Sequence, residues 1–140
     1  MGVGKDLWTE LETLVNKHDC SGMASMYAGD AVLVDPTGRY EGREAIQSRC
    51  EALDKPFPDG GSETSGLIEE GETVVAEYTW RGTNTGPLTM PDGTEIPATG
   101  KTVEMYGVDI ATVRDGKVAA QRDYFDMVAM MSQLGLMPGT

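Results

Sequence analysis

The sequence contains few of the residues from which metal sites and nucleophilic sites are usually built. It has one histidine, His18, and two cysteines, Cys20 and Cys50, with no CxxC motif. A zinc site would need an unusual set of ligands, and the isolated cysteines predict two reduced thiols in a cytoplasmic protein. The sequence has no GxSxG, Walker or GxGxxG motif to support a serine hydrolase, a P-loop protein or a Rossmann fold. We expect any catalysis to use carboxylates, tyrosines, amides and arginines, with no metal and no organic cofactor.

Positive charge is scarce as well, because the chain has 23 acidic residues against 11 lysines and arginines, a formal net charge of −12. Such a surface repels nucleic acids and anionic membranes, so we expect neither as a partner. The N-terminal residues lack the apolar core of a signal peptide, and the longest uncharged stretch, Met127 to Thr140, is too short to span a bilayer. At 140 residues, the chain is expected to form one soluble domain over residues 1–140.

The spacing of apolar residues divides the chain into helices followed by strands. The expected helices are 5–18, a short one that includes 23–27, 43–53, and 127–134 capped by Asp126. The expected strands are 31–35, 63–69, 73–81 and two within 100–126, with a turn at 38–42, a linker at 60–62 and a long loop or ribbon at 84–99. Helices followed by antiparallel strands are typical of the α+β class. We expect a curved antiparallel sheet wrapped around the N-terminal helices, forming a cone with an internal pocket.

Residues 100–126 alternate in polarity as two strands joined by a turn, and each strand carries an acid in its apolar row. Asp109 interrupts the row within 103–113, and Asp123 interrupts the row within 119–125. A carboxylate on the inward face of a sheet is costly unless it is paired or has a task. Two such acids on one hairpin therefore indicate a functional site.

The type of turn decides whether these two acids share a face. A three-residue turn would make them diagonal neighbours on one face, with Asp109 opposite Gln121 and Asp123 opposite Gly107. A two-residue turn would shift the register by one and separate the acids onto opposite faces. We expect the three-residue turn, because it gathers the apolar residues of both strands on one surface and leaves room beside Asp123.

The alternate residues of the same hairpin would then face outward and form an apolar patch on a very acidic protein. Such patches usually mark an interface, so we expect a two-fold homodimer built on this face, with Arg122 at its rim. The residues of the patch are Tyr106, Val108, Ile110, Val118, Ala120 and Tyr124.

Several motifs follow one another along the chain, and together they point to one family. They include Asp35-Pro36, Gly42-Arg-Glu-Ala-Ile, Arg81-Gly-Thr-Asn-Thr-Gly-Pro-Leu and the closing Arg122-Asp-Tyr-Phe-Asp. With the order of elements, they resemble the SnoaL-like polyketide cyclases over nearly the whole chain. That family belongs to the nuclear-transport-factor-like superfamily with the cone fold, which also includes ketosteroid isomerase and limonene epoxide hydrolase.

The resemblance implies roles for the two acids. In the cyclases, the first acid of the closing motif is the catalytic acid/base, which corresponds to Asp123. The best-known cyclase has a histidine where this chain has Asp109, and the resulting acid pair looks more like that of the epoxide hydrolases, although the sequence does not place the arginine that accompanies it there. Two close carboxylates would split their titration, so that one stays protonated near neutral pH. The resemblance also implies sheet-to-sheet dimers.

Seven further residues are candidates for binding an apolar substrate around the acids, although the aromatic residues and the methionine could equally be ordinary core and Asp35 could simply start a turn. They are Tyr27, Asp35, Tyr78, Trp80, Met105, Gln121 and Phe125. The leading hypothesis is an intramolecular aldol ring closure of a polyketide-type carbonyl compound by acid/base catalysis. The alternatives are an epoxide hydrolase, a hydroxylase-like member of the family, or a non-catalytic module for small-molecule binding or dimerisation.

Overall fold

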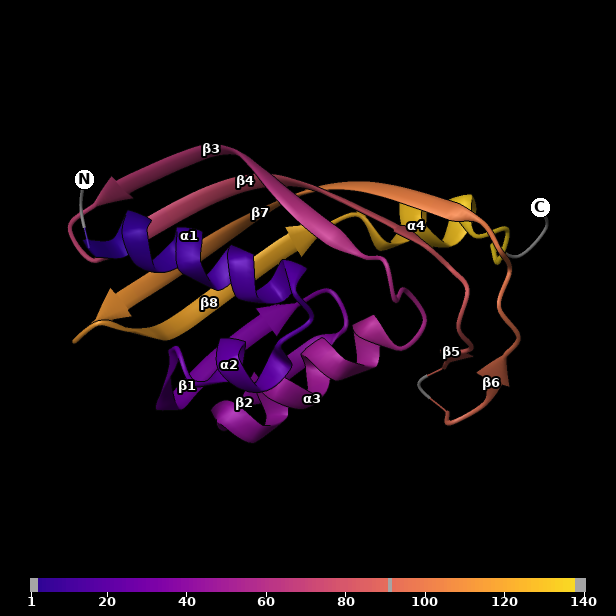
Figure 1. Ribbon diagram of the computed structural model, residues 1–140, viewed down its shortest axis with the longest axis horizontal. Helices are drawn as coiled ribbons and strands as arrows, with labels where there is room; N and C mark the ends of the chain where they lie inside the picture. The colour runs from indigo at the N-terminus through magenta and orange to yellow at the C-terminus, as the bar shows by residue number, and fades with distance from the viewer. Residues whose placement is uncertain (1–2, 91, 138–140) are drawn as a thin grey trace.

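A curved six-stranded sheet forms the frame of this protein, and helices lie along its concave side (Figure 1). The structure is a computed structural model that describes residues 3–90 and 92–137. The helices are α1 (Val3–Asn16), α2 (Cys20–Ala24), α3 (Gly42–Asp54) and α4 (Met127–Gln133). The strands are β1 (Tyr27–Asp35), β2 (Gly38–Glu41), β3 (Gly61–Glu70), β4 (Thr73–Thr83), β5 (Leu88–Thr89), β6 (Glu95–Ile96), β7 (Thr102–Arg114) and β8 (Lys117–Phe125).

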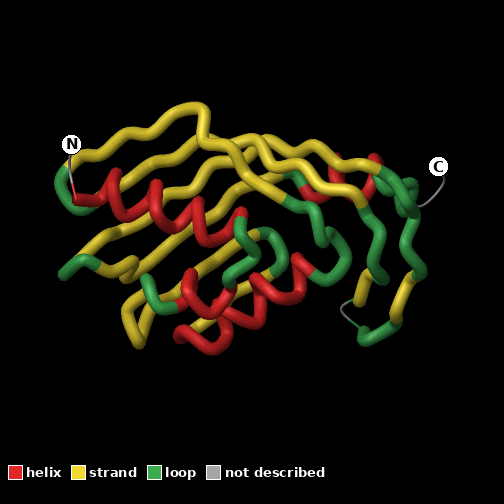
Figure 2. Tube along the Cα trace, viewed as in Figure 1, coloured by secondary structure: helices red, strands yellow, loops and turns green. Residues whose placement is uncertain are grey.

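The strands of the large sheet lie in the order β2-β1-β8-β7-β4-β3, and β5 and β6 pair as a separate short ribbon (Figure 2). Neighbouring strands of the large sheet are antiparallel except for β1 and β8, which are parallel. The predicted α+β class, with a curved sheet around the N-terminal helices, is confirmed. The sheet is mixed rather than purely antiparallel, because β1 runs parallel to its neighbour β8, the last strand of the chain.

The helices cover the concave face with apolar residues at helical spacing. In α1, Leu7 and Leu11 are buried one turn apart, and the helix packs on β3 and β4. In α3, Ile46 and Cys50 are buried at the same spacing, and the helix packs on β1. Residues three and four apart share one side of a helix, so each helix presents an apolar stripe to the sheet and a polar side to solvent.

The apolar core consists of two clusters that follow one another along the strands. On the inward row of β7, Val103 and Met105 belong to one cluster, whereas Ala111 and Val113 belong to the other. Asp109 lies between them and is buried like its neighbours. The boundary between the two clusters therefore coincides with the acid of β7.

The hairpin of β7 and β8 has a tighter turn than the sequence predicts. Arg114 pairs with Lys117, so only Asp115 and Gly116 form the turn. Both have positive φ, 53° and 72°, as a type I′ turn requires. The expected three-residue turn was therefore wrong, and a regular ladder continued from this turn would have separated the two acids.

A β-bulge in β8 returns the acids to one face. The ladder skips Ala119, and beyond this residue Asp109 pairs directly with Asp123 rather than with Gln121. One extra residue reverses the alternation of inward and outward side chains, which compensates for the short turn. The two-residue turn pairs Val118 with the inward-facing Val113, so this member of the predicted outer patch is fully buried.

Cys20 and Cys50 form a disulfide, so the prediction of two reduced thiols was wrong for this structure. Helices α2 and α3 pack against each other and bring the two Cα atoms to 5.7 Å, an ordinary distance for a disulfide. The pairing could not be predicted from the spacing of the cysteines, because it depends on how two separate helices meet.

The other differences concern the ends of elements. The expected turn at 38–42 contains β2, the expected linker at 60–62 contains the start of β3, and Tyr27 begins β1 instead of ending the second helix. Such short stretches show too few alternations for a pattern to be read. The segment 84–99 contains the β5–β6 ribbon, one of the two forms expected for it. Within the described residues, none of the helices has the combination of length and apolar character needed to cross a membrane.

Asn84 anchors the base of this ribbon. Its side chain is fully buried, and its Nδ2 atom donates to the carbonyl oxygens of Pro56 at 3.1 Å and Gly86 at 2.8 Å. Its Oδ1 atom accepts from the Thr99 backbone nitrogen at 2.8 Å and from the Thr99 hydroxyl at 2.9 Å. One amide thus ties both ends of the ribbon to the loop that follows α3.

We expect Asn84→Ala to lower the free energy of unfolding by about 2–4 kcal/mol, because several buried hydrogen-bonding groups lose their partner at once. Urea unfolding followed by circular dichroism measures the change. Thr85→Ala, at the exposed neighbouring position, is the control and should stay within about 0.5 kcal/mol of the wild type. Equal effects of the two substitutions would contradict the anchoring role of Asn84.

Candidate active site

The two acids of the hairpin lie side by side on the concave face of the sheet. Asp109 in β7 and Asp123 in β8 are direct cross-strand partners, 9% and 8% exposed. Directly opposed residues of an antiparallel pair have Cβ atoms about 4.5–5.5 Å apart, closer than the diagonal arrangement expected from the sequence. The pair therefore shares one buried environment.

Asp123 has a partner for each carboxylate oxygen. The hydroxyl of Tyr78 donates to Oδ1 at 2.6 Å, and Nη2 of Arg49 donates to Oδ2 at 3.0 Å. Tyr78 reaches this position across Gly107, where a Cβ atom would lie 2.3 Å from the phenol oxygen. Gly107 was expected opposite Asp123 but pairs with Phe125, and the room it leaves is occupied by Tyr78.

Arg49 joins Asp123 to Asp35. Its Nε atom donates to Oδ2 of Asp35 at 2.6 Å, while Oδ1 of Asp35 accepts from the backbone nitrogen of Thr37 at 2.7 Å and from its hydroxyl at 2.6 Å. Asp35 thus both starts the turn after β1 and fixes the guanidinium. Because β1 and β8 are adjacent parallel strands, the end of β1 lies beside Asp123.

Arg49 is not among the site residues predicted from the sequence, although the sequence contains a signal for it. Arg49 follows the buried Ile46 by three residues and precedes the buried Cys50, so it lies near the apolar side of α3. A basic residue in this position needs a buried acid as partner.

Asp109 is held by a neutral chain of hydrogen bonds. Nε2 of Gln121 donates to its Oδ1 atom at 2.8 Å, and the hydroxyl of Tyr27 donates to Oε1 of Gln121. All three side chains are buried. Gln121 and Tyr27, which the sequence suggested as substrate-binding residues, therefore orient Asp109.

Burial dominates the titration of the two acids. It raises the pKa of Asp109 well above its usual range, and the charge of Asp123 raises it further. Burial also raises the pKa of Asp123, but Arg49 and the hydrogen bond from Tyr78 act against this increase. Within the pair, the surroundings therefore favour the proton on Asp109, because only Asp123 has the Arg49 guanidinium as a partner.

The other ionisable groups of the site keep their usual forms. Burial raises the pKa of both Tyr27 and Tyr78, so each phenol stays a hydrogen-bond donor. Burial alone would lower the pKa of Arg49, but Asp35 and Asp123 outweigh it and the net pKa is raised. The site thus combines the fixed positive charge of Arg49 with the adjacent carboxyl groups of Asp109 and Asp123.

The remaining three candidates belong to the apolar cluster next to the acids. Trp80 and Met105 are buried, and Phe125 is half-buried beside them. Trp80 makes an edge-on contact with Phe57, with ring centroids 5.0 Å apart. The structure therefore places these side chains at one end of the acid pair, where they can form an apolar wall. The other candidates form two adjacent hydrogen-bonded groups: Asp109 with Gln121 and Tyr27, and Asp123 with Tyr78, Arg49 and Asp35.

Comparison with known proteins identifies relatives of this fold. Residues 5–134 match the family model described as SnoaL-like polyketide cyclase. A search of curated proteins gives no match. AclR of Streptomyces galilaeus, a proposed hydroxylase, is 24% identical, with a TM-score of 0.80 and coverage of 97% of this chain and 87% of AclR. IdmH of Streptomyces antibioticus, a proposed polyketide cyclase, is 25% identical, with a TM-score of 0.76 and coverage of 93% of this chain and 96% of IdmH.

A third structure carries the name of a related fold. It is a protein of Catenulispora acidiphila with a ketosteroid isomerase-like fold, solved in complex with trimethylamine. Its identity is 17%, its TM-score is 0.79, and the match covers 94% of this chain and 93% of that one. These structures agree on the fold, and the family model covers nearly all of the sequence. This chain belongs to the SnoaL-like polyketide cyclase family.

Proposed function

We propose that this protein is a cofactor-independent enzyme of the cyclase/isomerase type that closes a ring in an apolar polyketide-type carbonyl compound by an intramolecular aldol reaction. The family supports the cyclase/isomerase type. The observation that carries the finer proposal is the direct pairing of Asp109 with Asp123 on the buried face, where Arg49 contacts Asp123 and the neutral amide of Gln121 contacts Asp109.

In the first step, Asp123 takes a proton from a carbon flanked by carbonyl groups. Arg49 and Tyr78 fix the carboxylate and keep it ionised, while each oxygen retains a lone pair for the incoming proton. The conjugated carbonyls of such a substrate spread the charge of the enolate, so a site with few hydrogen-bond donors suffices.

In the second step, the enolate carbon attacks a distant carbonyl, and Asp109 gives its proton to the alkoxide that forms. The amide of Gln121 holds Asp109 in place throughout. One proton enters the pair at Asp123 and one leaves it at Asp109, so a single proton transfer between the two neighbours restores the starting state.

The apolar end of the site favours an apolar substrate bound in a folded conformation. Trp80, Met105 and Phe125 lie beyond the acids and contribute surface without competing hydrogen bonds. Holding a flexible chain so that its two reacting carbons meet supplies much of the rate in a reaction of this kind. The substrate is therefore expected to be a neutral polycarbonyl compound rather than a charged metabolite.

Epoxide opening is the second candidate, and Arg49 favours it. The arginine that accompanies the acid pair in the related epoxide hydrolases has a counterpart here in Arg49, which ion-pairs with Asp35 and Asp123. In that reaction, Asp123 would activate a water molecule and Asp109 would protonate the epoxide oxygen. Incorporation of labelled oxygen from water into the product distinguishes the two reactions, because ring closure by aldol addition incorporates none. A hydroxylation, the chemistry proposed for AclR, is a further family alternative.

The catalytic assignment predicts that Asp123→Asn keeps the fold but lowers turnover about 100-fold or more, since a neutral amide cannot accept the substrate proton. Product formation from model polycarbonyl compounds and epoxides, followed by mass spectrometry, measures it. Asp115→Asn, in the exposed turn of the same hairpin, is the matched control and should retain full activity. Turnover of Asp123→Asn within a few-fold of the wild type would remove this residue from the mechanism.

Proton holding by Asp109 predicts a pH-dependent effect on stability. Because its pKa is raised on folding, its contribution to stability is fully present below the unfolded pKa of about 3.9 and is lost as pH rises through the folded pKa. Asp109→Asn stays neutral at every pH and keeps the oxygen that Gln121 contacts. We expect its advantage in melting temperature over the wild type to grow between about pH 5 and pH 8, by about 4 °C for each kcal/mol. An advantage independent of pH would contradict the assignment, and Asp115→Asn again serves as control.

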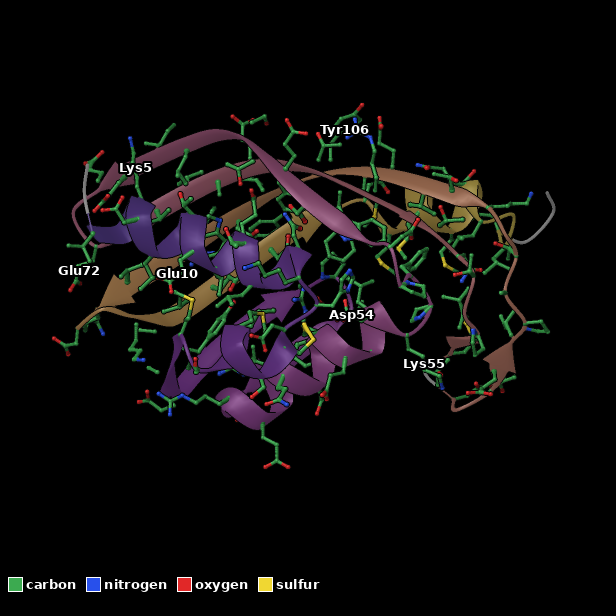
Figure 3. The ribbon with its side chains drawn as sticks, in the orientation of Figure 1. Lys5, Glu10, Asp54, Lys55, Glu72 and Tyr106 are labelled. Carbon is green, nitrogen blue, oxygen red and sulfur yellow. A yellow bond between two sulfur atoms is a disulfide. The ribbon has the colours of Figure 1, made fainter. Side chains whose placement is uncertain are left out.

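The outer face of the sheet supports a two-fold homodimer as part of the proposal. Tyr106 and Tyr124 are 70% and 53% exposed, and Figure 3 shows Tyr106 projecting on the side away from the helices. Val108, Ile110 and Ala120 are half-buried on the same face, and Arg122 is exposed there. An apolar surface of this kind on a strongly acidic chain favours a self-complementary interface.

For this interface we expect Val108→Asp to place two unpaired charges near the two-fold axis and to weaken the dimer at least about tenfold, or to give insoluble protein. Light scattering and sedimentation over a concentration series measure the association. Val128→Asp introduces the same charge at an exposed apolar position on α4 and should leave the dimer intact. A wild-type protein that is monomeric at micromolar concentration would refute the interface.

A further inference from the structure

A second group of reactive side chains surrounds the disulfide, where α2 meets α3. Oδ2 of Asp54 lies 3.1 Å from Sγ of Cys20 and 3.9 Å from Sγ of Cys50. Nδ1 of His18 lies 2.9 Å from Oδ1 of Asp54. Figure 3 shows Asp54 beside the yellow sulfur–sulfur bond. His18, Cys20 and Asp54 also line a shallow depression in the surface, so the group can be reached from solvent.

Two of these contacts are poorly explained by the disulfide alone. A disulfide sulfur carries no proton, so the carboxylate oxygen near Cys20 accepts no hydrogen bond from it. Nδ1 of His18 is a buried nitrogen with no hydrogen-bond partner among the described residues, because its approach to Asp54 is out of line. A cation between the nitrogen, the carboxylate and the sulfurs would satisfy all of them.

We propose that His18, Cys20, Cys50 and Asp54 bind one zinc-type divalent cation when the disulfide is reduced. Thiolates, imidazole and carboxylate are the ligands of Zn²⁺, and two thiolates discriminate against Mg²⁺ and Ca²⁺. This site is separate from the acid pair and does not depend on the proposed catalytic function. One histidine and two cysteines far apart along the chain predict no ordinary zinc site, but the fold brings the cysteines together.

The spacing of the donor atoms fits such a site after a small adjustment. The ligand atoms of Cys20, Cys50 and Asp54 all lie within 4.8 Å of one another. In a tetrahedral zinc site, ligands at about 2.0–2.3 Å from the ion lie about 3.3–3.8 Å apart. Reduction lets the two sulfurs move apart to this spacing, whereas Oδ2 of Asp54, 3.1 Å from Cys20 and 3.9 Å from Cys50, needs little movement.

The local sequence helps to preform the ligand set. Cys50 and Asp54 are four residues apart in α3, so they project from the same side of the helix. His18 and Cys20 flank Asp19, whose side chain caps α2 through the backbone nitrogen of Gly22. Each half of the site is thus held by its own backbone, and the imidazole of His18, which lies outside the group of mutually close donor atoms, must move toward the sulfurs to join the other three ligands.

The exchange between the disulfide state and the metal-bound state needs only a small thiol as reductant and the cation. Two molecules of a small thiol reduce the disulfide to two cysteine thiols and become one disulfide themselves. The cation then displaces the two thiol protons and binds the thiolates. A cytoplasm, where the protein is expected to work, keeps cysteines reduced, so the metal-bound state is the one favoured there.

Zinc titration of the full chain tests the proposal. The protein is reduced with a phosphine, freed of the reductant without oxygen, and titrated with zinc chloride against a chromogenic chelator. We expect one equivalent to bind to the reduced wild type, and at least about 100-fold weaker binding to the oxidised wild type, whose sulfurs are unavailable. Cobalt in place of zinc should give thiolate-to-metal charge-transfer absorption in the reduced protein only.

Variants distinguish zinc binding by the four proposed ligands from nonspecific attraction of zinc to the acidic surface. Asp54→Asn and His18→Gln should each weaken zinc binding at least about tenfold, and Cys50→Ser at least about 100-fold. Glu51→Gln removes an acid from the same depression without touching the ligands and should bind like the wild type. A reduced wild type that binds less than about half an equivalent, whether folded or not, would overturn the site, as would equal binding by Asp54→Asn and Glu51→Gln.

Discussion

The two ion pairs of Arg49 hold the acid site together. The guanidinium comes from α3 and joins Asp35 at the end of β1 to Asp123 in β8, so the helix layer and the sheet meet at this charge. Taking a carboxylate out of water costs several kcal/mol, and only a partner or a proton offsets that cost. Asp35 and Asp123 have the arginine, whereas Asp109 contacts the neutral amide of Gln121. The position of the Arg49 guanidinium therefore favours ionisation of Asp123 over ionisation of Asp109.

The shared face of the two acids could be predicted from the sequence, but their register could not. Burial of apolar residues determines which side chains point inward, and both Asp109 and Asp123 lie in inward rows. The register depends on the turn and on any bulge, and here a two-residue turn at Asp115 and Gly116 is combined with a bulge at Ala119. A three-residue turn with no bulge at Ala119 places the two acids on the same face. The prediction of the face was therefore correct although the predicted turn was not. It did not reveal that the acids are direct partners or that Val118 points inward.

Two further features that the sequence did not reveal depend on contacts between distant elements. The guanidinium of Arg49 extends from α3 to acids on two strands. The spacing of apolar residues predicts the helix itself but not which strands it packs against. The Cys20–Cys50 pairing depends on the packing of α2 on α3. By contrast, the α+β class, the four helices and the acid-bearing hairpin follow from patterns within single elements, and these predictions agree with the structure apart from the ends of the elements.

Helix α3 links the two clusters of reactive side chains. Arg49 and Cys50 are consecutive, and consecutive residues of a helix point about 100° apart, so one reaches the acids while the other reaches α2. The link at Cys50 therefore fixes the rotation of α3 about its axis, and α3 carries the Arg49 guanidinium into the acid site. A disulfide and a bound metal ion would each preserve this link, whereas two free thiols would leave it to packing alone. The geometry of the acid pair thus depends on a connection on the far side of the helix that need not contact the substrate.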